Sequence, residues 1–226
     1  MSAKLRELFI LIGIGAALAI IMIVLLTLPG RQTTHDNDNI IQFGSHKWRV
    51  LDIQGNYALI ISENIISHRM YHNTNQAVTW ETSDIREYLN STFLNTFNET
   101  DRARIRETII INNDNPWLGT NGGENTKDKI FLLSIEEVVR YFGDSGQLEN
   151  SPDGVSWIWD EYSETRIAQD ITGSASWWWL RSPGFSPFGA ASVSGNGILS
   201  VHGSDVFWSG GAGGGVRPAL WLILYD

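Results

Sequence analysis

The residues of this sequence with the best-placed binding chemistry are aromatic and polar side chains in its last third. They are Phe185, Phe188, His202, Asp205 and Trp208, which lie in or beside glycine and serine turns. Turns on a rigid scaffold commonly display binding groups, and aromatic rings with polar neighbours are usual ligand anchors. These five residues predict a ligand-binding surface, with ordinary loop packing as the alternative.

Three consecutive tryptophans, Trp177, Trp178 and Trp179, stand in the stretch SASWWWLRSPGF. Successive side chains of a strand face opposite sides of the sheet, so Trp177 and Trp179 share one face and Trp178 takes the other. A strand covered on both faces would use all three as core. On a partly open face, an indole such as that of Trp178 would instead stack on a sugar ring or an aromatic group.

Two arginines, Arg181 and Arg217, stand just after or just within apolar strand sequence. A buried guanidinium needs hydrogen-bond partners, so we expect both to bind loop carbonyls or carboxylates. The alternative is bidentate binding of a carboxylate or phosphate on a ligand.

No motif for catalysis is present, and the sequence predicts neither an enzyme nor a cofactor. The chain has no cysteine, no G-x-S-x-G, no P-loop and no Rossmann fingerprint. The histidines at 35, 46, 68, 72 and 202 lack the spacing of a zinc site. Oxygen-rich runs at Asn112–Asn115 and Asp160–Glu161 leave calcium open as a ligand, although they match no EF-hand and are more typical of turns.

Local signals predict the elements in the first half of the globular part. Two apolar runs around Gln54-Gly55-Asn56 predict a β-hairpin over 46–53 and 57–62. Apolar residues at helical spacing predict a helix from Ser83, and a second one capped by Asn98 that carries Ala103, Ile105 and Ile109. The S-x-x-E box at Ser134 predicts a short helix ending at Gly143.

The second half is dominated by strand and turn signals. Trp177–Arg181 predicts one strand, and alternating apolar residues around Gly195-Asn196-Gly197 predict two more. After a glycine run, 216–224 predicts a closing strand with Pro218 near its start or on an edge.

The N-terminal region predicts a membrane anchor. Residues 8–28 carry no charge and, as a helix, span roughly 31 Å, enough to cross the lipid bilayer. Lys4 and Arg6 precede this span, which predicts a cytoplasmic N-terminus over 1–7, a linker over 29–39 and one extracellular domain over 40–226. Whether the anchor is kept or cleaved stays open. A net charge of −9 argues against a nucleic-acid partner.

Five blocks in order, among them HKWRVLDIQGNYALIIS, WWWLRSPG and GVRPALWL, resemble an uncharacterised domain family of bacterial, mostly Gram-positive, cell-surface proteins. The pairing of WLRS with GVRPAL also resembles the fold shared by C-type lectins and the formylglycine-generating enzyme. That second resemblance implies an α+β domain with a small twisted antiparallel sheet, two to three helices and long loops. It implies neither the oxidase chemistry nor calcium-dependent sugar binding, because the cysteines and the sugar-binding motifs are missing.

These observations predict a single-pass protein of the bacterial cell membrane whose extracellular domain recognises a ligand without transforming it. The expected partner is a glycan, a cell-wall fragment or another protein. Two alternatives stay open: a structural or assembly subunit of a membrane-protein complex, and an enzyme with a site assembled from distant loops.

Overall fold

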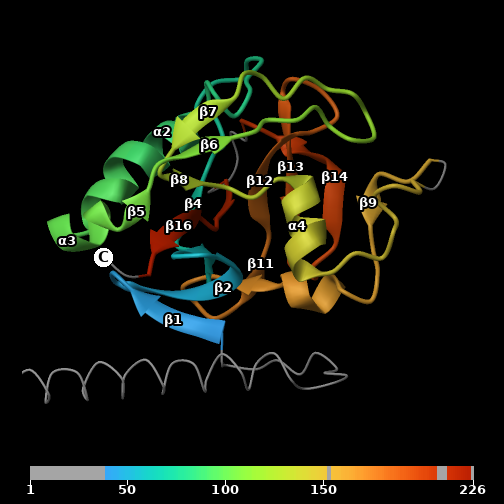
Figure 1. Cartoon of the computed structure of the whole chain (residues 1–226). Helices are drawn as coiled ribbons and strands as arrows, with labels where there is room; N and C mark the ends of the chain where they lie inside the picture. The colour runs from blue at the N-terminus through green and yellow to red at the C-terminus, as the bar shows by residue number, and fades with distance from the viewer. Residues whose placement is uncertain (1–38, 152–153, 208–212, 225–226) are drawn as a thin grey trace, which may run out of the picture. The chain divides into compact units, whose positions relative to one another are not determined.

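In the computed structural model of the chain (Figure 1), residues 39–151, 154–207 and 213–224 are described, and they belong to one compact unit. This unit is built mostly of β-sheets with a few short helices. The prediction of an α+β, C-type-lectin-like domain is therefore wrong. The α-helices of the described part span only five to eight residues, whereas the two larger sheets contain six strands each, so strands dominate the fold.

No helix of the described residues is long and apolar enough to cross a membrane. The transmembrane helix predicted over 8–28 and the cytoplasmic segment over 1–7 lie outside the described residues.

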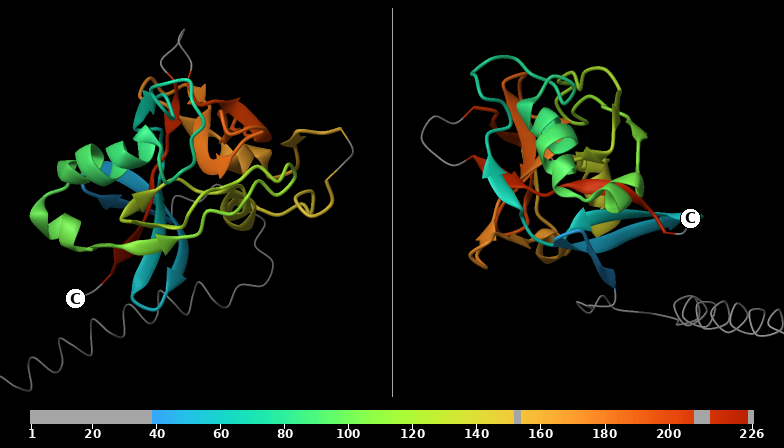
Figure 2. Two further views of the ribbon diagram at one scale, coloured as in Figure 1. Left: turned by 90° about the horizontal axis from the view of Figure 1, so that it is seen from above. Right: turned by 90° about the vertical axis from the view of Figure 1, so that its left-hand side faces the viewer.

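The first sheet, sheet A, is antiparallel and contains the predicted hairpin. Its order is β1 (Ile40–Phe43), β2 (His46–Gln54), β3 (Tyr57–Ser62), β16 (Ala219–Ile223) and β5 (Ile105–Arg106), and β8 (Ile130–Phe131) also pairs with β16. The hairpin prediction is confirmed, since β2 and β3 pair from Gln54↔Tyr57 onward around the turn at Gly55. Figure 2 shows β1 and β2 at one end of the domain.

The second sheet, sheet B, holds the meander that carries most of the predicted binding residues. Its order is β4 (Ser67–Arg69), β15 (Gly214–Val216), β12 (Trp178–Pro183), β13 (Gly189–Val193), β14 (Leu199–Asp205) and β9 (Trp157–Ile158). The antiparallel β12, β13 and β14 confirm the predicted meander, while β15 pairs in parallel with β12. Figure 1 shows these three strands side by side.

Two small hairpins and several short helices complete the described part. The hairpins are β6 (Thr108–Ile110) with β7 (Thr126–Asp128), and β10 (Ala168–Gln169) with β11 (Ala175–Ser176). The helical elements are α2 (Asp84–Tyr88), continued by π and 3-10 turns over 89–96, then α3 (Glu99–Ala103), α4 (Ile135–Phe142) and a 3-10 turn at Ser163–Arg166. Ser83, where a helix was predicted to start, and the predicted caps Asn98 and Ser134 all accept a backbone N–H. The capping box of Ser134 with Glu137 is complete.

Two predicted elements are wrong because some of their residues pair with strands from distant parts of the chain. The helix capped by Asn98 ends at Ala103, since Ile105 pairs with Leu222 in sheet A and Ile109 lies in β6. The single closing strand over 216–224 is divided between β15 in sheet B and β16 in sheet A. The chain changes sheets at Arg217 and Pro218, where proline cannot donate to a strand ladder.

The core joins the two sheets through α4 and a set of large aromatic rings. Trp48, Trp80, Trp178 and Trp179 are all almost fully buried. Helix α4 packs on sheet B, with the ring centroids of Phe142 and Trp178 6.4 Å apart. Burying large aromatic rings supplies much of the folding free energy of a domain without disulfides.

Candidate functional site

Phe185 and His202, both singled out in the sequence, form a stacked pair on the surface. Their ring centroids are 4.5 Å apart and the ring planes differ by 9°. The Phe185 side chain is 60% exposed and His202 is also exposed. Apolar rings are usually buried, so a flat aromatic pair open to solvent offers a face on which another ring can stack.

The loop that carries Phe185 is held closely between β12 and β13. The Phe185 N–H donates to the His202 carbonyl at 2.7 Å, and the Gly184 N–H donates to the Gly189 carbonyl at 2.8 Å. The Thr120 hydroxyl donates to the Phe185 carbonyl at 3.2 Å. With its backbone groups bound in this way, the loop presents Phe185 in a defined orientation, which lowers the entropy cost of binding.

Gly203 gives β14 the bend that follows His202. Its φ of +77° lies in the left-handed region, and a Cβ added there would stand 2.1 Å from the Ala190 carbonyl oxygen. Only glycine fits both the dihedral angle and the space. The register between β13 and β14 shifts between Ala190 and Ser192, as expected of a β-bulge beside this glycine.

Phe188 and Asp205 lie next to this pair. The Phe188 carbonyl accepts the Val206 N–H at 2.9 Å, and Gly189 is paired with Asp205 across the two strands. The Phe188 side chain is 43% exposed, and Asp205 is exposed. The structure therefore brings four of the five predicted residues to one end of the β12–β14 meander. The fifth, Trp208, lies outside the described residues.

Trp157 is a further exposed aromatic residue beside the same strand, and no pattern in the sequence singles it out. It pairs with Ser200 across β9 and β14 and is 51% exposed. The carbonyl of Ser156, its neighbour, accepts the His202 N–H at 3.1 Å. Trp157, Ile158 and Trp159 are all apolar, so no alternation marks the strand. We call Phe185, Phe188, His202 and Trp157 together the aromatic surface.

A histidine and an aspartate lie close together near the end of β14, where the His72 N–H donates to the Val206 carbonyl at 3.1 Å. The Nδ1 of His72 is 2.9 Å from the Asp84 carboxylate, and its Nε2 is 2.7 Å from the Gln76 side-chain amide. An imidazole oriented by a carboxylate is the arrangement of many general bases. Here the second nitrogen contacts Gln76 and the residue is 7% exposed, so the ring is closed off from a substrate.

Trp178 and the two arginines are buried among other residues. Trp178 is fully buried and its indole N–H donates to the Arg166 carbonyl at 3.2 Å. Arg181 forms a two-pronged ion pair with Glu137 and donates to the Leu132 carbonyl at 2.8 Å. Trp178 and Arg181 thus bind other parts of the fold: Trp178 joins β12 to the 3-10 turn at Ser163–Arg166, and Arg181 joins β12 to α4.

Arg217 is bound where the chain passes from sheet B to sheet A. Its Nε donates to the Ser62 carbonyl at 3.0 Å, and its guanidinium carbon lies 5.0 Å from the centroid of the Trp178 ring. Burial lowers the pKa of Arg217 to about 10, and the charge of Glu63 opposes this shift. Arg217 therefore keeps its positive charge at neutral pH. That charge stabilises the carbonyls where the chain passes from sheet B to sheet A.

The side chains of the oxygen-rich runs considered for calcium form hydrogen bonds within the fold. The Asn112 amide donates to the Glu124 carbonyl, and Asp114 accepts the Gly122 N–H, which fixes the β6–β7 loop. Burial raises the pKa of Asp160, but hydrogen bonds from Arg166 and Ser145 outweigh it and hold the pKa below its usual value. Within the described part of the chain, no three His, Asp or Glu side chains gather into a metal site.

The fold and the site define a mainly β domain that displays an aromatic surface on the loops and edge of one sheet. Residues 55–224 match a family described as a domain of unknown function (DUF6273), and because the match covers most of the chain, the chain belongs to that family. This agrees with the predicted membership of an uncharacterised domain family. No curated protein and no solved structure matches the chain.

Proposed function

We propose that this domain is a non-catalytic recognition module that binds a carbohydrate on the aromatic surface. The observation that carries the proposal is the parallel stacking of Phe185 on His202, with both residues exposed to solvent. The carbon face of a sugar ring packs well on such a flat aromatic face, and by analogy with aromatic pairs we expect about 0.5–1.5 kcal/mol from each stacked ring. Trp157 supplies an indole beside the same strand.

Polar groups near the rings support a sugar over a purely apolar ligand. Asp205 offers carboxylate oxygens as acceptors, and the exposed His202 ring offers nitrogens at the edge of the stack. A small number of polar groups around an apolar platform is the usual composition of a specific small-molecule site. The predicted position of this domain outside the cell stays a prediction, and the proposed binding does not depend on it.

The test is a glycan array probed with the full chain, repeated with calcium and with a chelator, followed by calorimetry on the best binder. Phe185→Ala and Trp157→Ala should each lower the affinity about 3–10-fold by removing a stacking ring. Ile53→Ala is the control, because Ile53 is 62% exposed at the far end of the β2–β3 hairpin. Equal affinities for all three variants would refute the proposed surface.

An assembly subunit is a second candidate, favoured by exposed isoleucines on the β6–β7 hairpin. Ile109 and Ile111 are 62% and 51% exposed and, two residues apart, lie on one side of the chain. Sedimentation of the full chain separates the candidates. A dimer or larger complex that Ile109→Ser dissociates would favour assembly, and a monomer in which Ile109→Ser changes nothing would exclude self-assembly through this hairpin.

A further inference from the structure

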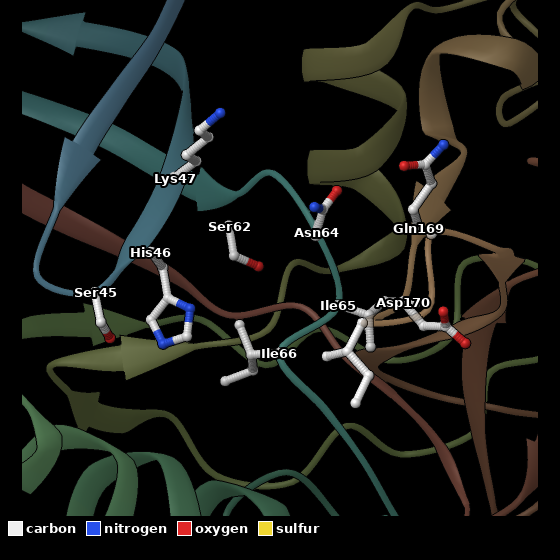
Figure 3. Close-up of a pocket in the computed structure, with 11 residues that line it drawn as sticks. Ser45, His46, Lys47, Ser62, Asn64, Ile65, Ile66, Gln169 and Asp170 are labelled. Atoms are coloured by element: carbon white, nitrogen blue, oxygen red, sulfur yellow. The ribbon is translucent and has the colours of Figure 1, made fainter.

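A pocket of about 390 Å³ lies away from the aromatic surface, between sheet A and the β10–β11 hairpin (Figure 3). Its walls come from three segments: Ser45–Lys47 at the start of β2, residues 62–66 after β3, and residues 169–173 in the β10–β11 turn. We call it the hairpin pocket. Its volume falls at the lower end of the roughly 300–1,000 Å³ usual for small-molecule sites.

The walls of the hairpin pocket are tied to one another by main-chain hydrogen bonds. The Ile65 N–H donates to the Gln169 carbonyl at 2.9 Å, and the Glu63 N–H donates to the Lys47 carbonyl at 2.9 Å. The turn is closed by Asp170, whose carboxylate accepts the N–H and hydroxyl of Thr172. The pocket is therefore a built feature of the fold, with little ordering left to occur on binding.

The most informative group of the pocket is the Ser62 hydroxyl. Ser62 is 1% exposed, and among the described residues its Oγ has no hydrogen-bond partner. Figure 3 shows this oxygen directed toward the space between His46, Asn64 and Ile66. A buried hydroxyl without a partner costs about 1–3 kcal/mol, so a ligand group that bonds to this oxygen gains affinity by satisfying it.

The remaining lining combines neutral polar groups with isoleucines. Asn64 and Gln169 carry amides that both donate and accept, and both side chains are exposed. Ile65 is buried and lines the pocket, while Ile171 is 86% exposed in the β10–β11 turn. An isoleucine this exposed at the edge of a pocket offers an apolar contact to a ligand that enters the pocket.

The charges of the lining argue for a neutral ligand. Lys47 and Asp170 bring one charge of each sign, and the Asp170 carboxylate also lies 3.9 Å from the Nε2 of His68. Burial lowers the pKa of His46, which favours a neutral imidazole with one donor and one acceptor nitrogen. No single sign of charge dominates the lining, as it would in a site for an anion or a cation.

We propose that the hairpin pocket binds a neutral, hydroxyl-rich small molecule bearing a short apolar group, the chemistry of an N-acetylated monosaccharide. The ligand's hydroxyls pair with the Ser62 hydroxyl and the amides of Asn64 and Gln169. Its acetyl methyl packs on the isoleucines. This site goes beyond the proposed function, because it shares no residue with the aromatic surface and needs no stacking ring.

The test is an NMR titration of the 15N-labelled full chain with N-acetylglucosamine, glucose and glycerol. The acetylated sugar should give saturable shifts at residues 62–66 and 169–173, glucose weaker ones, and glycerol none that saturate. Ser62→Ala should weaken the binding of N-acetylglucosamine about fivefold while leaving the fold intact, since the lost hydroxyl bonds to no described residue. Ile171→Ala should reduce the preference for N-acetylglucosamine over glucose.

Ser67→Ala is the matched control. The Ser67 Oγ is also buried without a partner among the described residues, but Ser67 does not line the pocket. Its variant should bind N-acetylglucosamine as the unaltered chain does. Equal affinities of Ser62→Ala and Ser67→Ala, or no saturable shift in the two segments, would overturn the proposal. Phe185→Ala should leave these shifts unchanged, which separates this outcome from failure of the aromatic surface.

Discussion

The Nδ2 of Asn115 donates to the Val201 carbonyl at 2.9 Å and thereby joins the loop after β6 to the strand that carries His202. The same nitrogen lies 2.8 Å from the Pro183 carbonyl at the end of β12. The Asn115 Oδ1 accepts the N–H groups of Trp117 and Leu118. One buried amide therefore joins the end of β12, which leads into the loop of Phe185, to β14, which carries His202.

Asn115→Ala is expected to lower the free energy of unfolding by about 3 kcal/mol, because it leaves several buried groups without partners. Urea unfolding measures this loss. Asn121→Ala is the control, since exposed Asn121 accepts only a local N–H from Gly123, and should cost well under about 1 kcal/mol. Similar losses for both variants would mean that Asn115 does not organise the meander.

Gly203→Ala is expected to destabilise the domain more than Gly55→Ala. Both glycines have a positive φ, which costs an alanine about 1–2 kcal/mol. At Gly55 nothing lies within 4 Å of the added Cβ, whereas at Gly203 the Ala190 carbonyl oxygen lies 2.1 Å away. Thermal unfolding of the two variants gives the difference, and equal melting temperatures would contradict the close approach.

Asp160→Asn is expected to cost about 3–5 kcal/mol, because it leaves the guanidinium of Arg166 buried without its counter-charge. The two side chains are 2.9 Å apart and almost fully buried. Arg140→Gln is the control, since Arg140 is 67% exposed and 4.0 Å from Asp52, and such a pair contributes at most about 1 kcal/mol. Urea unfolding compares the two variants. Equal losses of unfolding free energy would show that Asp160 does not stabilise the buried Arg166.

The free energy of unfolding is expected to fall as the pH drops below the ordinary histidine pKa of 6.5. Burial lowers the pKa of His46 in the folded chain, so the unfolded chain binds this proton first. The contribution of His46 is present above pH 6.5 and is lost as the pH falls toward the lowered pKa. Urea unfolding at about pH 7.5 and about pH 5.5 measures the slope. His46→Gln should reduce it, and an unchanged slope would exclude His46 as its source.

Local chemistry allowed part of the fold to be predicted from the sequence. The hairpin around Gly55 and the capping box at Ser134 depend on neighbouring residues alone, and both are present. The pairing of Ile105 with Leu222 and the change of sheet at Arg217 depend on contacts between distant parts of the chain. Such contacts leave no periodic signal, so the predicted helix and the single closing strand were wrong.

In the candidate site, too, local sequence signals could be predicted and contacts between distant parts of the chain could not. Phe185, Phe188, His202 and Asp205 could be singled out because aromatic and polar residues stand beside turn residues. Their meeting at one end of the meander follows from strand pairing. Trp157 and the unpartnered Ser62 hydroxyl could not be found, because one lies in an unbroken apolar run and the other looks like any strand serine.

The central place of β16 in sheet A has a consequence for the order of assembly during synthesis. Strand β3 lies between β2 and β16, and from Ala58 to Ser62 it is buried. Until Ala219–Ile223 has emerged from the ribosome, this strand presents an open, apolar edge, the kind of edge that recruits other chains. The nascent protein must therefore shield that edge, through chaperones or temporary pairing, from the synthesis of β3 until that of β16.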